Sequence, residues 1–376
     1  MIAIILILLI TILTVAHFYL KCSVMTAFST FMAAIFGSII AFNYYELLAD
    51  LFVSRGYGGP WAHAGCFILA FVLGFAAVRA LADLLVGANI DFGKNPKIIV
   101  NIILGLVTGL ILSGHLLIAL GMLPIEGGWA YNRFPAGSPI SLNNPKTIPL
   151  NPDGLVSSIF STFSKGSLSS NKSFGVLCAD FANRNHLNRH GVKEGIWTVS
   201  SRKALSIPAA SKKPVRTMDI PDVGNVTVVR AILAFRDIPD GGAKQPPDGN
   251  IVFSMSQVRM ITKGSDNAGN LRGSGKALWP IGILEKGKLV KKSLSDMMTY
   301  TNKEARKDRT VWVDFVFETP ASQQGVLLEF KLNAIAQLPA PAVSTEELEN
   351  ALNAAEEQPA ENGTEQAPAQ PAANQP

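Results

Sequence analysis

The chain has 376 residues, of which 48% are apolar and 16% are charged, and its formal net charge is +5. This composition excludes a wholly disordered chain, and the crowding of apolar residues into the first third excludes a wholly soluble one. Before Pro124 the chain has five Lys and Arg residues and four Asp and Glu residues, a net charge of +1. The segment after Leu338 has seven glutamates and no Lys or Arg, a net charge of −7, so the region between them carries +11.

Four apolar runs precede Pro124, and each is long enough to cross a ~30 Å hydrocarbon core. We predict transmembrane helices over residues 1–20, 24–48, 61–86 and 98–123. No positive charge precedes the first run and no small-residue cleavage site follows it, so we interpret it as a retained helix and not as a cleaved signal.

Small residues recur in the second and fourth runs at spacings that allow close helix contact in lipid. Gly37 stands among alanines and serines in the second run. The fourth run contains Gly105 and Gly109 as a G-xxx-G pair, followed by Gly114. We predict that these four glycines pack against a neighbouring helix, in the same bundle or in an oligomer.

Three charged residues lie within the apolar runs. Arg79 and Asp83 are four apart in the third run, so they share one helix face and can pair. Glu46 marks the far end of the second run. Two interpretations stay open: groups that anchor the helices at the interface, or groups that line a path for a solute.

The loops differ in positive charge. Lys21, Lys94 and Lys97 lie in the loops after the first and third helices, whereas the loop after the second helix carries Arg55. Positive-inside counting therefore places the first and third loops in the cytoplasm. With four helices, the N-terminus and everything after Pro124 are then expected outside the cytoplasm.

Four short-looped helices open the chain, and the last of them reads N-x3-G-x3-G, formed by Asn101, Gly105 and Gly109. This membrane region resembles the colicin V production protein family. The resemblance covers the helices only and rests on pattern, without a catalytic signature. It implies an integral protein of the bacterial inner membrane, tied to toxin production or export and to envelope upkeep, and it implies no known active site.

After Pro124 the sequence becomes polar. Residues 125–153 are rich in Pro, Gly, Asn and Ser and predict an extended linker. Residues 151–163 predict a short amphipathic helix that packs on its own domain or lies on the membrane surface. Five strand-like segments follow, and they predict a mainly β domain over residues 154–338, built as a sandwich or a barrel. These segments are 226–235, 251–261, 277–284, 311–318 and 326–332.

The last stretch, residues 339–376, consists mainly of Ala, Pro, Glu, Gln and Asn and has no aromatic residue. Such a composition buries too little apolar surface to fold, so we predict a disordered acidic tail.

Chemical motifs are few. His186 and His190 stand four residues apart near Cys178 and Asp180, but no third ligand is fixed, and we predict no metal site. The run 273–276 resembles a phosphate loop, but its leading glycine is displaced and alanine follows it where Ser or Thr is needed. The chain has no nucleophile elbow and no HExxH. We therefore predict a non-enzymatic protein without a cofactor.

Basic residues of the central region cluster without interleaved aromatics, notably Lys286, Lys288, Lys291 and Lys292. An extracytoplasmic site excludes nucleic acid, so the expected partner is a lipid headgroup, an anionic envelope polymer or a protein. The leading interpretation is a bilayer-embedded protein with an extracytoplasmic binding domain. The alternative is an oligomeric transporter or channel in which polar residues of the second and third helices line a path.

Overall fold

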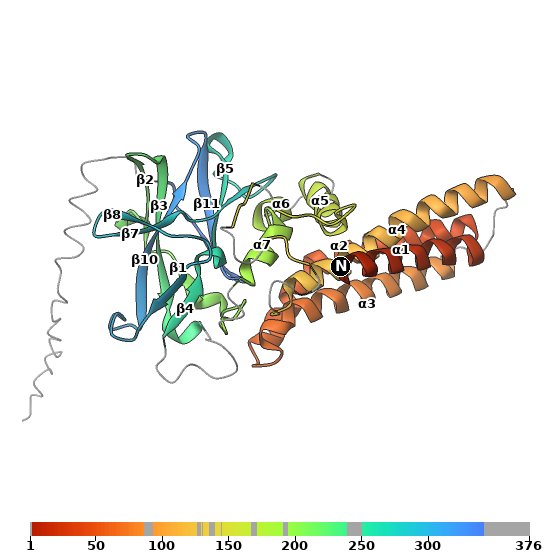
Figure 1. Cartoon of the computed structure of the whole chain (residues 1–376), viewed down its shortest axis with the longest axis horizontal. Helices are drawn as coiled ribbons and strands as arrows, with labels where there is room; N and C mark the ends of the chain where they lie inside the picture. The colour runs from red at the N-terminus through yellow and green to blue at the C-terminus, as the bar shows by residue number, and fades with distance from the viewer. Residues whose placement is uncertain are drawn as a thin grey trace, which may run out of the picture.

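The structure is a computed structural model, and it describes residues 2–85, 93–125, 129, 131–134, 140–143, 145–166, 171–190, 195–238 and 250–341. A bundle of long helices forms one end of the molecule and a β domain forms the other (Figure 1). The prediction of four apolar helices followed by a mainly β domain is confirmed. From residue 342 on, the predicted tail lies outside the described residues.

The bundle contains α1 (Ile2–Lys21), α2 (Val24–Val53), α3 (Ala62–Leu85) and α4 (Lys94–Met122). All four are long and apolar enough to cross a membrane. Ser23 is the N-cap of α2, because its side chain accepts a hydrogen bond from the backbone amide of Thr26. The outer faces of the helices expose large apolar side chains such as Leu13 and Leu73, as expected for a surface in contact with lipid.

Glycines set the spacing of α1 and α4. A Cβ atom on Gly109 would lie 2.7 Å from the Cα of Thr11, and one on Gly105 would lie 2.9 Å from the Cα of Val15. The two backbones therefore touch, and a larger side chain at either glycine would separate them.

Asn101 completes this seam, because its Nδ2 donates hydrogen bonds of 2.9 Å to the carbonyl oxygens of Phe18 and Cys22. Gly37 has a similar place between α2 and α3, since a Cβ there would lie 3.0 Å from the backbone nitrogen of Phe75. The N-x3-G-x3-G pattern thus forms the contact between the first and last membrane helices.

A layer of short helices lies between the bundle and the β domain (Figure 1). It contains α5 (Pro152–Lys165), α6 (Phe174–Leu177) and α7 (Phe181–Asn188). The predicted amphipathic helix is α5, and it packs on α4 and α2 of the bundle: Gly114 faces Pro152, and the ring of Phe160 stacks on Phe42 at 4.7 Å. Each of the four predicted glycines therefore meets another helix of the same chain.

Within the described residues, the β domain contains three antiparallel sheets. One has the order β1-β3-β10-β7-β8, with β2 also paired to β3. Its strands are Leu205–Ser206 (β1), Val215–Ile220 (β2), Gly224–Ala234 (β3), Gly282–Glu285 (β7), Lys288–Lys291 (β8) and Thr310–Glu318 (β10). The second has the order β12-β11-β5-β6, formed by Val258–Gly264 (β5), Lys276–Leu278 (β6), Gln323–Phe330 (β11) and Ala334–Gln337 (β12). Ile251–Ser254 (β4) and Met297–Tyr300 (β9) form the third.

The sheets share one apolar core. Phe253 of β4 lies at its centre, with ring centroids 6.2 Å from Phe315 of β10 and 5.2 Å from Phe330 of β11. Within the described residues the sheets do not close on themselves. Of the two predicted alternatives, the barrel is therefore excluded.

Candidate functional site

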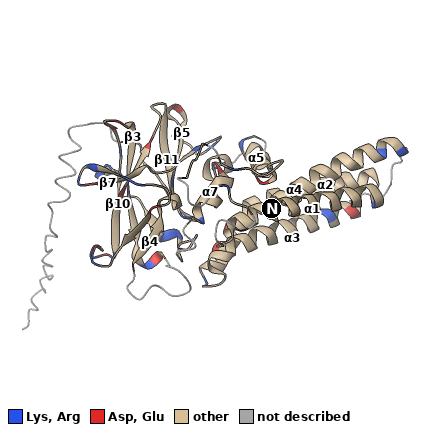
Figure 2. Cartoon of the chain, in the orientation of Figure 1, with Lys and Arg blue, Asp and Glu red and all other residues tan. Residues whose placement is uncertain are grey.

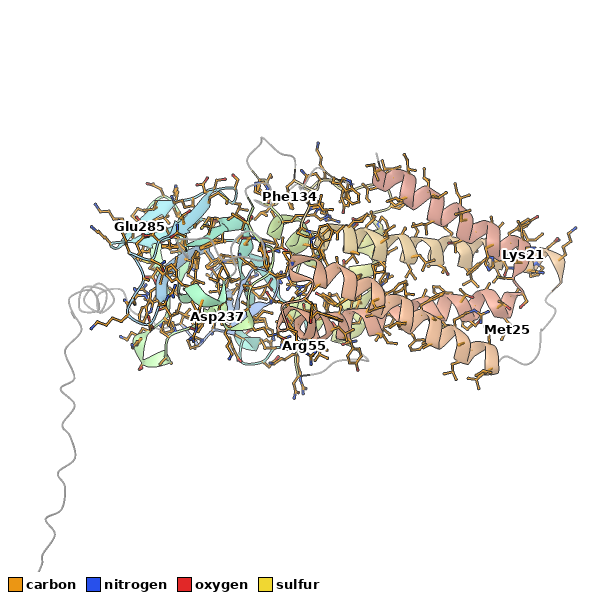
Figure 3. The ribbon with its side chains drawn as sticks, turned by 90° about the horizontal axis from the view of Figure 1, so that it is seen from below. Lys21, Met25, Arg55, Phe134, Asp237 and Glu285 are labelled. Atoms are coloured by element: carbon orange, nitrogen blue, oxygen red, sulfur yellow. The ribbon has the colours of Figure 1, made fainter. Side chains whose placement is uncertain are left out.

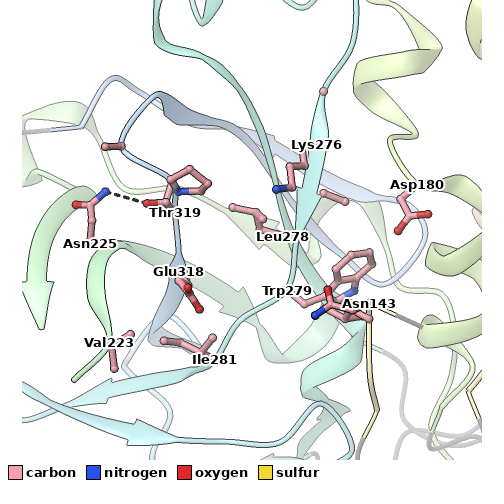
Figure 4. A pocket seen from close by; sticks show the side chains of 15 residues that line it. Asn143, Asp180, Val223, Asn225, Lys276, Leu278, Trp279, Ile281, Glu318 and Thr319 are labelled. Atoms are coloured by element: carbon pink, nitrogen blue, oxygen red, sulfur yellow. Dashed lines mark hydrogen bonds between the residues drawn. The ribbon is translucent and has the colours of Figure 1, made fainter. Parts of the chain in front are cut away.

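A cleft of about 860 Å³ opens between β6 of the second sheet and the end of β10 in the first (Figure 4). Its polar lining includes Asp180, Lys276 and Glu318, all of them exposed, and its apolar lining includes Leu278 and Ile281. A concave surface with apolar walls and a few placed polar groups is the usual form of a ligand site. We call this cavity the sheet cleft.

One long wall of the sheet cleft is β6, an edge strand, and the other is the end of β10, a strand that lies between β3 and β7 in its sheet. β6 is the last strand of its sheet, so in the described part of the chain no strand pairs with its outer side. β7 pairs with β10 only at Phe315 and Val316, so among the described residues no strand pairs with Phe317 and Glu318 on that side. Unpaired strand edges present backbone N–H and C=O groups that can hydrogen-bond an extended chain.

The end of the sheet cleft nearest the membrane is formed by Asp180, which directly precedes α7. Its backbone is left-handed, with φ at 53°, and its Oδ2 accepts a hydrogen bond of 3.0 Å from Nδ2 of Asn183. Trp279, also in the lining, is buried against Phe134 and Leu187. The floor of the cleft is therefore fixed by packing, while its carboxylates reach solvent.

A buried network of charges joins the β domain to α7 and to the bundle. We call it the junction network, and its members are Glu46, Arg184, Arg259 and Glu329. Glu329 of β11 accepts hydrogen bonds from Nε of Arg184 at 2.7 Å and from Arg259 at 2.6 Å. Arg184 also lies 3.5 Å from the carboxylate of Glu46 in α2. Burial is the largest influence on Arg184 and opposes its charge, but Glu329 together with Cys178, Tyr45 and Glu46 outweighs burial and raises the pKa of the guanidinium well above its usual range.

A second charged cluster fixes the stretch that the sequence predicts to be an extended linker. Arg133 is only 4% exposed and lies 3.1 Å from the carboxylate of Asp153. It also donates hydrogen bonds of 2.9 Å to the side-chain oxygens of Asn151 and Asn183. The chain before α5 is therefore tied to the start of α5 and to α7 through side-chain bonds.

The predicted membrane charges do not come together. Glu46 lies beside Arg184 of α7 at the β-domain end of α2, whereas Arg79 and Asp83 form an ion pair near the other end of α3. Figure 2 shows charged residues toward both ends of the bundle. Polar residues of α2 and α3 therefore do not form one continuous row of ionisable groups within the described structure.

The predicted basic residues lie on and beside the β7–β8 hairpin. Lys286, Lys288 and Lys291 are exposed and Lys292 is half-buried. This hairpin is at the end of the molecule away from the membrane helices, as the positions of Glu285 and Lys21 show (Figure 3). It is therefore placed to meet a partner in the compartment of the β domain and not the bilayer that holds the chain.

The structure does not place His186, a candidate metal ligand from the sequence, in a metal-binding environment. His186 is buried, with Nδ1 3.0 Å from the guanidinium of Arg189, and burial lowers its pKa well below the usual range. Burial also raises the pKa of the Cys178 thiol to about 12. In the part of the chain that the structure describes, no three metal-ligating side chains come together.

The sequence interpretation did not identify the sheet cleft or the junction network. One signal was present: Arg259 and Glu329 each interrupt an apolar, strand-like segment. A charge at such a position indicates either a solvent-facing site or a buried pair, and the structure shows the second.

Comparison of the chain with protein-family models, with curated proteins and with solved structures finds no match. The functional argument therefore rests on the residues and their geometry.

Proposed function

We propose that this chain is a non-enzymatic, multi-pass protein of the bacterial inner membrane that holds a peptide-binding β domain outside the cytoplasm. The observation that carries this proposal is the sheet cleft, which lies between the edge strand β6 and the end of β10 beyond its pairing with β7. An extended polypeptide can pair with such edges through its backbone, while pockets between them select side chains. Two carboxylates, Asp180 and Glu318, outnumber the one cation, Lys276, in the lining, and they favour a peptide that carries a basic residue.

The junction network supports a binding role because it holds the cleft on the bundle. Asp180 lines the cleft and directly precedes α7, and Phe181 of α7 packs on Phe42 of α2 with ring centroids 5.5 Å apart. A ligand at Asp180 would therefore lie one residue from a contact with the membrane helices. Such a domain acts as a fixed receptor at the membrane surface, and not as a freely tethered module.

The charges of the bundle support the orientation. Lys21 lies at the end opposite the β domain, and Arg55 lies at the end near it (Figure 3). Lys94 and Lys97 lie in the first turn of α4, at the same end as Lys21, since Asn101 of α4 bonds the carbonyl oxygen of Cys22. Cationic residues concentrate on the cytoplasmic side of membrane proteins, so the β domain is assigned to the other side. The resemblance of the helices to the colicin V production family extends the proposal to toxin production, export or envelope upkeep.

The alternative, an oligomeric transporter or channel, has less support. The glycines that would join copies of the chain already pack within one chain. Glu46 is paired with Arg184 at the junction and does not face Arg79.

The peptide-binding proposal is tested with the full chain in detergent and a panel of labelled seven-residue peptides. The panel is rich in Val and Thr and carries either Lys or Glu at the centre. We expect the Lys peptides to bind in an anisotropy titration, and Glu318→Lys to weaken that binding about tenfold, equivalent to ~1.4 kcal/mol. Glu285→Lys makes the same charge change on an exposed residue outside the cleft and should have no effect. Equal affinities for the two variants would contradict the proposed site.

A further inference from the structure

A second cavity, of about 390 Å³, lies among the four membrane helices. We call it the helix groove. Every helix of the bundle contributes a polar side chain to its lining: Thr14 and His17 from α1, Thr26 and Thr30 from α2, Arg79 from α3 and Thr108 from α4. Thr14 and Thr30 donate to carbonyl oxygens of their own helices, and Thr26 bonds Ser23, so the groups that indicate a functional site are the ionisable Arg79 and His17 together with Thr108.

The depth of the helix groove places it at one face of the bilayer. At about 1.5 Å rise per residue, Arg79 lies about 9 Å along the helix axis from the end of α3 at Leu85. His17 lies about 6 Å from the end of α1 at Lys21 on the same basis. These groups therefore lie near the headgroup level. The cavity continues beside Leu13 and Leu112, which are apolar and suited to an acyl chain.

The charge at this end of the bundle favours an anion. Lys21, Arg79, Lys94 and Lys97 outnumber the one carboxylate, Asp83, among the residues described there. Arg79 bonds Asp83 through one of its five N–H donors. Its planar guanidinium group keeps further N–H donors that can bind a second anion. Asp83 points to solvent, with 60% of its side chain exposed, against 23% for Arg79.

The floor of the helix groove carries an unsatisfied polar atom. Thr108 is fully buried, and its Oγ1 has no hydrogen-bond partner among the described residues. A buried hydroxyl without a partner is destabilising unless a ligand or a water reaches it.

We infer that the helix groove binds the phosphate of an anionic phospholipid from the leaflet at the end of the bundle opposite the β domain. The headgroup lies between Arg79 and His17, and an acyl chain lies along Leu13 and Leu112. Because the charge at this end is positive, a lipid with a net negative headgroup binds more tightly than a zwitterionic one. This inference does not depend on the peptide-binding proposal, since it concerns other residues at the opposite end of the bundle.

The test is native mass spectrometry of the full chain, released from detergent after titration with phosphatidylglycerol or phosphatidylcholine. We expect the wild-type chain to retain phosphatidylglycerol preferentially, and Arg79→Gln to lower that retention about fivefold, the factor expected for one cation near anionic lipid. The matched control is Arg55→Gln, which removes a cation from the other end of the bundle and should change nothing. Thr30→Leu fills the cavity from α2 while preserving a good helix former, so it tests the site if Arg79→Gln folds poorly.

Equal retention of both lipids by the wild-type chain would overturn the inference, as would equal losses in the Arg79 and Arg55 variants. If inorganic phosphate abolished the preferential retention of phosphatidylglycerol, the site would be assigned to free phosphate instead. A change in ion flux of proteoliposomes with unchanged lipid retention would identify the groove as a path and also contradict lipid binding.

Discussion

Replacing Glu329 with glutamine is expected to destabilise the β domain by about 3–5 kcal/mol, the usual cost of removing one partner from a buried ion pair. The side chain is almost fully buried and bonds two guanidinium groups, of Arg184 and Arg259. Glutamine keeps the shape but removes the counter-charge of Arg259 and leaves Arg184 with only the more distant carboxylate of Glu46. For a domain of this size the apparent Tm in detergent should fall by roughly 10 °C.

The matched control is Glu46→Gln, which removes the other carboxylate near Arg184. Its side chain is 32% exposed and lies 3.5 Å from the guanidinium, so we expect a loss below about 1 kcal/mol. Thermal unfolding followed by intrinsic fluorescence compares the two variants. Similar shifts for Glu329→Gln and Glu46→Gln would show that the junction network does not hold the domain as described.

Phe42→Ala is expected to loosen the junction between the bundle and the short helices. The Phe42 ring is 5% exposed and packs on Phe160 of α5, Phe174 of α6 and Phe181 of α7, with centroids 4.7, 5.1 and 5.5 Å away. Truncation of a buried phenylalanine costs about 3–5 kcal/mol because it leaves a cavity. We expect faster proteolysis of residues 140–190 in the detergent-solubilised chain.

Phe36 provides the control for this variant. It lies on the same helix, but its ring is 50% exposed on the outer face of the bundle. Phe36→Ala should therefore leave the rate of proteolysis near the wild-type value. Equal rates for the two alanine variants would mean that Phe42 does not join the layers.

The sequence predicts the long elements well because their patterns are local. The four apolar runs become α1 to α4, and the segments 226–235 and 311–318 become β3 and β10. These two strands are nine to eleven residues long and rich in β-branched and aromatic residues. They pair with each other over the length of β10.

Two predicted strands are divided in the structure, for local reasons. The segment 251–261 contains a capping box between Ser254 and Gln257, which ends β4 and begins a short turn before β5. Pro280 interrupts the segment 277–284, so that β6 and β7 join different sheets. Four-residue strands such as β8 and β9 carry too little periodic signal to be predicted.

The candidate sites depend on contacts between distant parts of the chain. The junction network brings residue 184 next to residues 259 and 329, and no spacing in the sequence encodes that meeting. The sheet cleft follows from the order of the strands, which leaves β6 at an edge. Arg79 and Asp83 could be predicted as a pair because they lie on one helical turn.

The central claim, a β domain held outside the cytoplasm, is tested most directly by cysteine labelling of the full chain in bacterial spheroplasts. The three native cysteines, all buried, are first replaced by alanine, and a single cysteine is then introduced at Lys288 or at Lys97. Both positions are exposed, Lys288 on the β7–β8 hairpin and Lys97 at the end of the bundle opposite the β domain. We predict that a membrane-impermeant maleimide labels Lys288→Cys in intact spheroplasts and labels Lys97→Cys only after lysis. Labelling of Lys97→Cys without lysis, with Lys288→Cys protected, would reverse the orientation and contradict the account.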